Sequence, residues 1–241
     1  MTAPQILVVG NGMVGHRTAE ALHARGVTRT HQVLVLGDEP HPAYDRVHLS
    51  RALTGDHHDL YLAQDSFYDQ PGLARRVGTP VTRLDRPAQE VVLADGSRLR
   101  YDALVLATGS HPFVPPISGA QAPHVLVYRT LEDVLALRHA AATARSAVVI
   151  GGGLLGLEAA GGLRDLGLTV AVVEVADRLM ARQVDEGGGA VLRRLVTDRG
   201  VAVHVGGGVA SVDTDRVTLT DGSTVTADLV VVAAGIRPRD E

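Results

Sequence analysis

Two glycine-rich turns, about 140 residues apart, constrain the fold of this chain more than any other feature of its sequence. They are residues 10–15 (GNGMVG) and residues 151–156 (GGGLLG). Each turn follows an apolar run that reads as a buried parallel strand, and each opens a helical pattern that a later glycine ends. A G-x-G-x-x-G turn between a strand and a helix is typical of dinucleotide binding, so the sequence predicts two such sites.

The spacing of these glycines has a physical reason. The first makes the tight turn, the second lets the backbone approach a pyrophosphate, and the third lets the helix pack closely on the strand. The anion then rests on the amides at the helix N-terminus. An acidic residue is expected at the end of the next strand, for the ribose hydroxyls: Glu174 follows residues 169–173, and Asp38 and Glu39 follow residues 32–37. The alternative is that both turns are structural and bind no ligand.

An internal repeat predicts the domain organisation. A hairpin that turns at Asp95-Gly96 leads into the strand of residues 103–109, and a hairpin that turns at Asp221-Gly222 leads into that of residues 229–235. The same order of elements in both halves predicts an α/β fold with two Rossmann-like, doubly wound lobes, each with a β-meander. We place the lobes at residues 1–119 and 146–232, the connecting segment at 120–145, and a return crossing at 233–241.

Composition excludes several function classes. The chain has 241 residues, a net charge of −4 and no cysteine. It therefore offers no basic field for nucleic acid and no thiolates for disulphides or iron–sulfur clusters. No apolar run approaches the roughly 20 residues of a membrane helix. We expect a cytoplasmic protein without nucleic-acid or membrane partners.

These motifs resemble the two-dinucleotide-binding-domain flavoproteins, the pyridine-nucleotide oxidoreductases that move a hydride from NAD(P)H to FAD. The resemblance covers essentially the whole chain. Within that superfamily, residues 44–50 (YDRVHLS) and 179–185 (LMARQVD) are similar to the N-terminal part of the large subunit of assimilatory nitrite reductases. Relatives that reduce ferredoxin or rubredoxin carry a close variant of the first segment, with Lys where this chain has Arg51.

The resemblance implies roles for individual residues. It assigns the first lobe to FAD and the second to NAD(P)H, and Gly235 is also expected to bind cofactor. The residues expected at FAD are Gly10, Gly12, Met13, Val14, Gly15, Asp38, Glu39, Arg46, Ser50, Val81, Ala107, Thr108, Gly109 and Arg129. Those expected at NAD(P)H are Gly151, Gly153, Leu154, Leu155, Gly156 and Glu174.

Arg51 and Glu158 are the catalytic residues that the resemblance implies. Arg51 would lie by the flavin ring, paired with Glu158, and would act as an electrostatic clamp because arginine keeps its proton at neutral pH. The pair is alternatively a plain inter-domain salt bridge, and Arg46 a helix-surface charge. No metal is expected at residues 56–59 (DHHD), because adjacent histidines point different ways on regular structure.

The expected function is that of an FAD-dependent NAD(P)H oxidoreductase module in nitrate assimilation. It would pass electrons from NADH through FAD to a redox acceptor domain or subunit, of siroheme and iron–sulfur type in a nitrite reductase. NADH is expected rather than NADPH, because Glu174 would repel a 2′-phosphate. The alternatives are a ferredoxin or rubredoxin reductase and a truncated, non-catalytic nucleotide-binding protein. We expect the FAD lobe to be incomplete at its C-terminal end, which leaves a sheet edge open. The chain then either self-associates through that edge or depends on a separate polypeptide that supplies the missing element.

Overall fold

The computed structural model describes residues 3–240, which form two compact units. Within the described residues, unit 1 comprises residues 3–47, 58–110 and 238–240, and unit 2 comprises His48–His57 and His111–Arg237. Residues 48–57 and 111–119 thus belong to unit 2, although the sequence places them in the first lobe. Residues 48–57 join unit 2 because their short helix α2 (Arg51–Thr54) packs on two helices of that unit.

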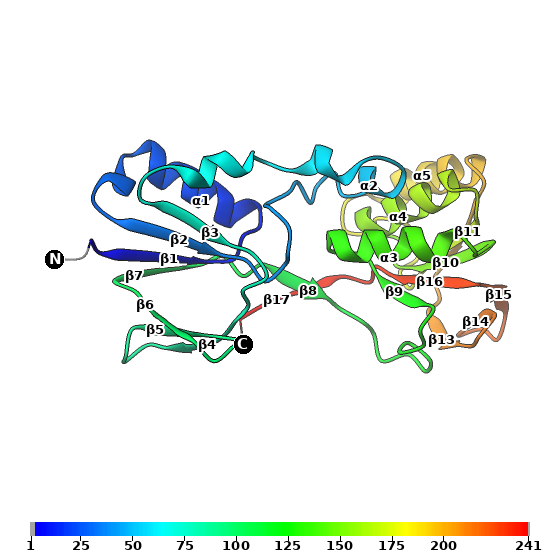
Figure 1. Ribbon diagram of the computed structural model, residues 1–241. Helices are drawn as coiled ribbons and strands as arrows, with labels where there is room; N and C mark the ends of the chain where they lie inside the picture. Colours follow the sequence, from blue (N-terminus) through cyan, green and yellow to red (C-terminus); the bar gives the residue numbers. More distant parts are fainter. Residues whose placement is uncertain (1–2, 241) are drawn as a thin grey trace. The chain divides into compact units, whose positions relative to one another are not determined.

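Unit 1 is built on a four-stranded parallel sheet, with a three-stranded antiparallel meander inserted between its strands β3 and β7 (Figure 1). Strand β1 lies in the interior of the sheet and β7 at one edge, in the order β3-β2-β1-β7. The parallel strands are β1 (Gln5–Val9), β2 (Gln32–Leu36), β3 (Leu73–Arg76) and β7 (Ala103–Leu106). The meander strands are β4 (Val81–Asp85), β5 (Glu90–Leu93) and β6 (Arg98–Arg100).

The two faces of the unit 1 sheet have separate cores, because side chains alternate along each strand. Ile6 and Val8 of β1 face helix α1 (Met13–Ala24), and Leu7 and Val9 face the meander. Figure 1 shows α1 and the meander on opposite sides of the sheet. The layers therefore place the first glycine turn where β1 ends and α1 begins.

Unit 2 repeats this plan with one more parallel strand. Its sheet has the order β12-β11-β10-β16-β9, and an antiparallel meander follows β12 along the chain. The parallel strands are β9 (Val125–Val127), β10 (Ser146–Ile150), β11 (Thr169–Glu174), β12 (Val201–Val205) and β16 (Leu229–Val232). The meander strands are β13 (Val209–Val212), β14 (Arg216–Leu219) and β15 (Thr224–Thr226). The longer helices are α3 (Leu131–Ala141), α4 (Leu154–Asp165) and α5 (Glu186–Asp198).

The predicted repeat is confirmed at the level of single hydrogen bonds. In the meander of unit 1 the Leu93 amide donates to the Ser97 carbonyl at 2.9 Å, and in unit 2 the Leu219 amide donates to the Ser223 carbonyl at 2.8 Å. Both turns place their glycine at positive φ, as the sequence pattern Asp-Gly requires. The two lobes therefore share the same order of elements and the same hairpin geometry.

A short two-stranded sheet joins the segments that run between the units. It pairs β8 (Ser110–Pro112) with β17 (Ile236–Pro238). The remaining elements are short 3-10 turns at Val27–Arg29, His57–Leu60 and Asp65–Asp69. Across residues 3–240, no helix has both the length and the apolar character needed to cross a membrane.

Candidate functional site

In the first glycine turn, two glycines have no room for a side chain, and the middle glycine has space for one. Gly10 has φ of +115°, and a Cβ there would lie 2.0 Å from the Ala107 carbonyl oxygen. A Cβ on Gly15 would lie 1.8 Å from the Gly10 carbonyl oxygen. A Cβ on Gly12 would meet only Arg46 Nε, at 3.9 Å. Gly10 and Gly15 are therefore required because the backbone packs closely against them. Gly12 instead leaves the backbone of the turn accessible from outside.

The second turn repeats this geometry in unit 2. Gly151 has φ of +117°, and its Cβ would lie 2.4 Å from the Ala233 carbonyl oxygen. A Cβ on Gly156 would lie 1.9 Å from the Gly151 carbonyl oxygen, whereas a Cβ on Gly153 would have no atom within 4 Å. Both turns thus expose backbone at their second glycine, where a pyrophosphate needs close approach.

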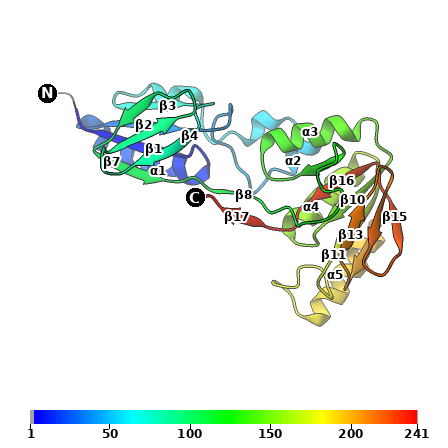
Figure 2. The ribbon, with the colours of Figure 1, turned by 90° about the horizontal axis from the view of Figure 1, so that it is seen from below.

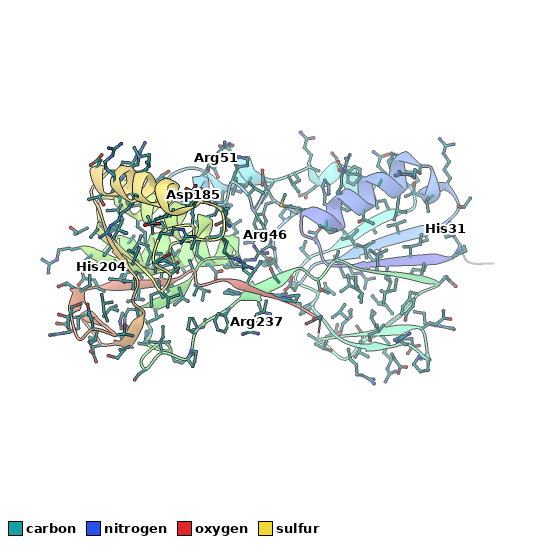
Figure 3. All side chains as sticks on the ribbon, turned by 180° about the vertical axis from the view of Figure 1, so that it is seen from behind. His31, Arg46, Arg51, Asp185, His204 and Arg237 are labelled. Atoms are coloured by element: carbon teal, nitrogen blue, oxygen red, sulfur yellow. The ribbon has the colours of Figure 1, made fainter. Side chains whose placement is uncertain are left out.

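The helices that open from these turns lack side-chain caps. Gly12 begins α1 and Gly153 begins α4, and neither helix start receives a side-chain hydrogen bond. By contrast, the Thr130 hydroxyl caps α3 and the Asp185 carboxylate caps α5; Asp185 is labelled in Figure 3. The N-terminal amides of α1 and α4 are therefore available to an anion.

The acid after β2 is held by a cation beside the first turn. Arg46 pairs with Glu39, which also accepts a hydrogen bond of 2.6 Å from the Tyr44 hydroxyl. The Arg46 guanidinium stacks on the Tyr44 ring, 4.8 Å from its centroid. Because Arg46 also borders Gly12, its positive charge lies next to the N-terminus of α1. It is not a helix-surface charge, since its side chain is only 21% exposed.

Asp38 binds a residue from the far end of the sequence. Burial raises its pKa, but the hydrogen bond and charge of Arg239 outweigh burial and hold the pKa below its usual value. The Arg239 backbone also accepts a hydrogen bond of 2.7 Å from the Thr108 hydroxyl and donates one of 3.0 Å to the Gly109 carbonyl. Arg239 thus links the turn after β7 with Asp38, the acidic residue after β2.

In unit 2, Glu174 is fixed by backbone amides. Its carboxylate accepts hydrogen bonds from the Gly152 amide at 2.6 Å and from the Ala176 amide at 2.8 Å. Arg178 does not neutralise it, because its guanidinium donates to Asp177 and to the carbonyls of Ala181 and Val184. Glu174 therefore presents a negative charge at the second turn.

The expected pair of Arg51 and Glu158 is not formed. Within residues 3–240 the two side chains form no ion pair, and the only charge that acts on the Glu158 pKa is that of His48. Arg51 is exposed, and Figure 3 shows it pointing outward from α2. Burial raises the pKa of Glu158, and the charge that lowers it comes from His48. Burial and the Glu158 charge both raise the pKa of the nearby Tyr128 hydroxyl. Glu158 instead lies in a half-buried cluster with His48 and Tyr128, and the catalytic roles of Arg51 and Glu158 stay predictions.

The remaining expected residues lie in several parts of the two units. Leu154 is 56% exposed and Val14 68% exposed at the starts of their helices. Val81 begins β4, just after Thr79, whose amide donates to Gly37 beside Asp38. Met13, Leu155 and Ala107 belong to the turns or their contacts, and Ser50, Arg129 and Gly235 lie in unit 2.

Sequence reasoning missed Arg239, Tyr44 and Tyr128. Tyr44 lies in the segment that carries the resemblance, which is a signal that could have identified it. Arg239 and Asp38 are 201 positions apart in the sequence, and no local sequence pattern indicates their contact. Asp56, His57 and His58 each bring one ligand atom within 4.8 Å of the others, although alternation along the chain suggested that they diverge.

Comparisons with known proteins agree with this geometry. Residues 4–241 match the family model described as pyridine nucleotide-disulphide oxidoreductase. The chain is 43% identical over 245 residues to the nitrite reductase [NAD(P)H] large subunit of Klebsiella oxytoca, covering 100% of this chain and 26% of that protein. It is 38% identical over 245 residues to the ferredoxin reductase component of chlorobenzene dioxygenase from Cupriavidus sp. strain PS12, covering 99% of this chain and 59% of that protein.

Solved structures give the same result. The ferredoxin reductase for the CYP199A2 system of Rhodopseudomonas palustris superposes with a TM-score of 0.90 at 32% identity, over 98% of this chain and 59% of that one. The chain therefore spans between about a quarter and three fifths of the length of these relatives. With both glycine turns, both acids and the family match in agreement, the chain belongs to the pyridine nucleotide-disulphide oxidoreductase family.

Proposed function

We propose that this chain is an FAD-dependent NADH oxidoreductase module that supplies electrons to a redox acceptor domain or subunit, as the input part of an assimilatory nitrite reductase. Bound FAD would accept a hydride from NADH and release electrons singly or in pairs. The observation that carries the proposal is the duplicated turn, open at Gly12 and Gly153 and uncapped at both helices. The identity of 43% with a nitrite reductase large subunit supports the choice of acceptor.

The residues present fit two dinucleotides. The open backbone at each second glycine suits a pyrophosphate, and Arg46 adds a positive charge beside the first turn. Asn11 Oδ1 and Glu158 Oε2 are buried without a hydrogen-bond partner in residues 3–240, and buried polar atoms of this kind suit donors on a bound ligand. We therefore assign FAD to unit 1, with Arg46 and Asp38 as its polar contacts, and the nicotinamide dinucleotide to unit 2.

Within unit 2 the chain's own residues favour NADH. Glu174 holds a carboxylate at the place where the adenosine ribose would lie, and Arg178 is occupied by backbone carbonyls. A 2′-hydroxyl can donate to that carboxylate, whereas a 2′-phosphate would be repelled by it. Arg51 would supply positive charge to the flavin, and its exposure leaves the guanidinium accessible.

A ferredoxin-type reductase is the second candidate, favoured by the 38% identity with the chlorobenzene dioxygenase component and by the solved reductase. Absorbance near 450 nm tests the shared part: FAD should bind, and anaerobic NADH should bleach it. Failure to bleach would leave only a nucleotide-binding role. The reduced protein should then pass electrons to a siroheme and iron–sulfur acceptor faster than to a ferredoxin, and the reverse order would establish the second candidate.

A further inference from the structure

The four-residue helix α2 carries Arg51 and follows Ser50, yet nothing in its own sequence can hold it in place. Isolated helices of this length are unstable in water. Ala52 and Leu53 are nevertheless fully buried, with 0% exposure. The position of α2 is therefore set by its neighbours, α3 and α4 (Figure 2).

One neighbour is a glycine on α4. A Cβ on Gly162 would lie 2.4 Å from Leu53 Cδ1, so the Leu53 side chain occupies the space that any other residue at 162 would fill. This contact fixes how closely α2 approaches α4. It does not fix α2 along its axis, because apolar contacts are not directional.

The directional contact comes from Arg138 on α3. Its Nη1 donates to the Ala52 carbonyl at 3.3 Å and to the Gly55 carbonyl at 3.1 Å. These acceptors lie in and just after α2, where carbonyls lack partners within the helix and a positive charge is favourable. Arg138 itself is well placed, because a Thr130–Asp133 capping box and the buried Leu137 fix α3.

We propose that Arg138 is a positioning residue that clamps the C-terminal end of α2 to unit 2 and thereby sets the positions of Ser50 and Arg51. The consequence for the flavin rests on the function proposed above, because Ser50 and Arg51 are the residues expected to contact it. The clamp itself rests only on contacts inside unit 2.

Hydrogen exchange tests the clamp without any cofactor. The amides of Leu53 and Gly55 donate to Ser50 and Arg51 carbonyls, so they report directly on α2. Arg138→Met keeps the aliphatic stem but removes both hydrogen bonds, and should speed exchange at these amides by about tenfold or more. Arg138→Lys should give a smaller increase. Arg164→Met is the matched control, since Arg164 makes a similar bond of 3.3 Å to the Arg199 carbonyl, and it should leave α2 unchanged.

Flavin chemistry tests the consequence. In Arg138→Met the rate of flavin reduction by NADH should fall several-fold, or the flavin potential should shift, while the dissociation constant of NADH stays as in the wild type. Unchanged exchange in α2 would overturn the clamp. Faster exchange with wild-type flavin rate and potential would overturn its link to Ser50 and Arg51. If the wild type binds no FAD, the proposed function fails, and the exchange experiment still decides whether Arg138 holds α2.

Discussion

Alanine at two glycines of the second turn should separate folding from dinucleotide binding. Gly156→Ala places a Cβ 1.9 Å from the Gly151 carbonyl oxygen, where ordinary contact begins at 3.4 Å. The obstacle is backbone, so α4 must move away from β10. Gly153→Ala places a Cβ with no atom within 4 Å, on extended backbone that alanine adopts freely. The added methyl group would nonetheless occupy the space at the turn through which a pyrophosphate approaches the backbone.

These distances predict that Gly156→Ala mainly lowers stability, whereas Gly153→Ala mainly weakens NADH binding. Overpacking of this severity costs about 3 kcal/mol or more, which for a chain of this size lowers Tm by about 6 to 12 °C. Gly153→Ala should change the free energy of unfolding by less than about 1 kcal/mol. It should instead weaken NADH binding by about tenfold or more, which corresponds to about 1.4 kcal/mol.

Thermal unfolding and NADH titration, run on both variants and the wild type, measure the two effects. A Gly156→Ala protein that melts with the wild type would show that the helix does not depend on this close approach. A Gly153→Ala protein that keeps wild-type NADH affinity would show that the dinucleotide does not lie on this turn. Either result would refute the geometric reasoning.

Four further predictions follow from single residues. Glu174→Ala should reduce the ratio of NADPH to NADH dissociation constants, and an unchanged ratio would remove the carboxylate as the selector. Arg51→Ala should slow stopped-flow reduction of the flavin with no more than about 1 kcal/mol lost in stability, whereas a wild-type rate would make Arg51 a surface charge. Burial lowers the pKa of His16 in the folded protein below its unfolded value of 6.5. The free energy of unfolding should therefore fall as pH drops below 6.5 and through the folded pKa, and His16→Gln should flatten this fall in denaturant titrations. If the chain self-associates through β7, where Leu106 is 61% exposed, Leu106→Lys should lower the mass measured by light scattering, and a monomeric wild type would contradict that contact.

The parts of the site that sequence predicted are those that local geometry dictates. Gly10 and Gly15 must be glycine because backbone lies within 2.0 Å of their missing Cβ atoms, and such a demand leaves a fixed spacing in the sequence. The hairpin at Asp95-Gly96 is equally local. The position of Glu174 follows from the strand that precedes it, since the carboxyl ends of neighbouring parallel strands meet at one edge of the sheet.

The parts that sequence missed depend on contacts between distant residues. Arg138 meets Ala52 across 86 positions, and Leu53 depends on the absence of a side chain at Gly162. Neither contact produces a periodic pattern, so the sequence groups residues 48–57 with the first lobe, whereas their contacts lie in unit 2. The pairing of Arg51 with Glu158 was inferred by resemblance; within residues 3–240 the structure shows Arg51 exposed and no ion pair between the two side chains.

Residues 48–57 leave the ribosome long before the residues on which they pack. Gly162 follows Leu53 by 109 residues, which takes about 5 to 20 s at ordinary rates of translation. During that interval Ala52 and Leu53, which are fully buried in the folded protein, have no α4 to pack on. Unit 1 also depends on a segment made late, because Asp38 binds Arg239, which follows it by 201 residues. Neither unit can be completed from its early residues alone, so until α4 has been made the nascent chain offers an apolar segment to chaperones.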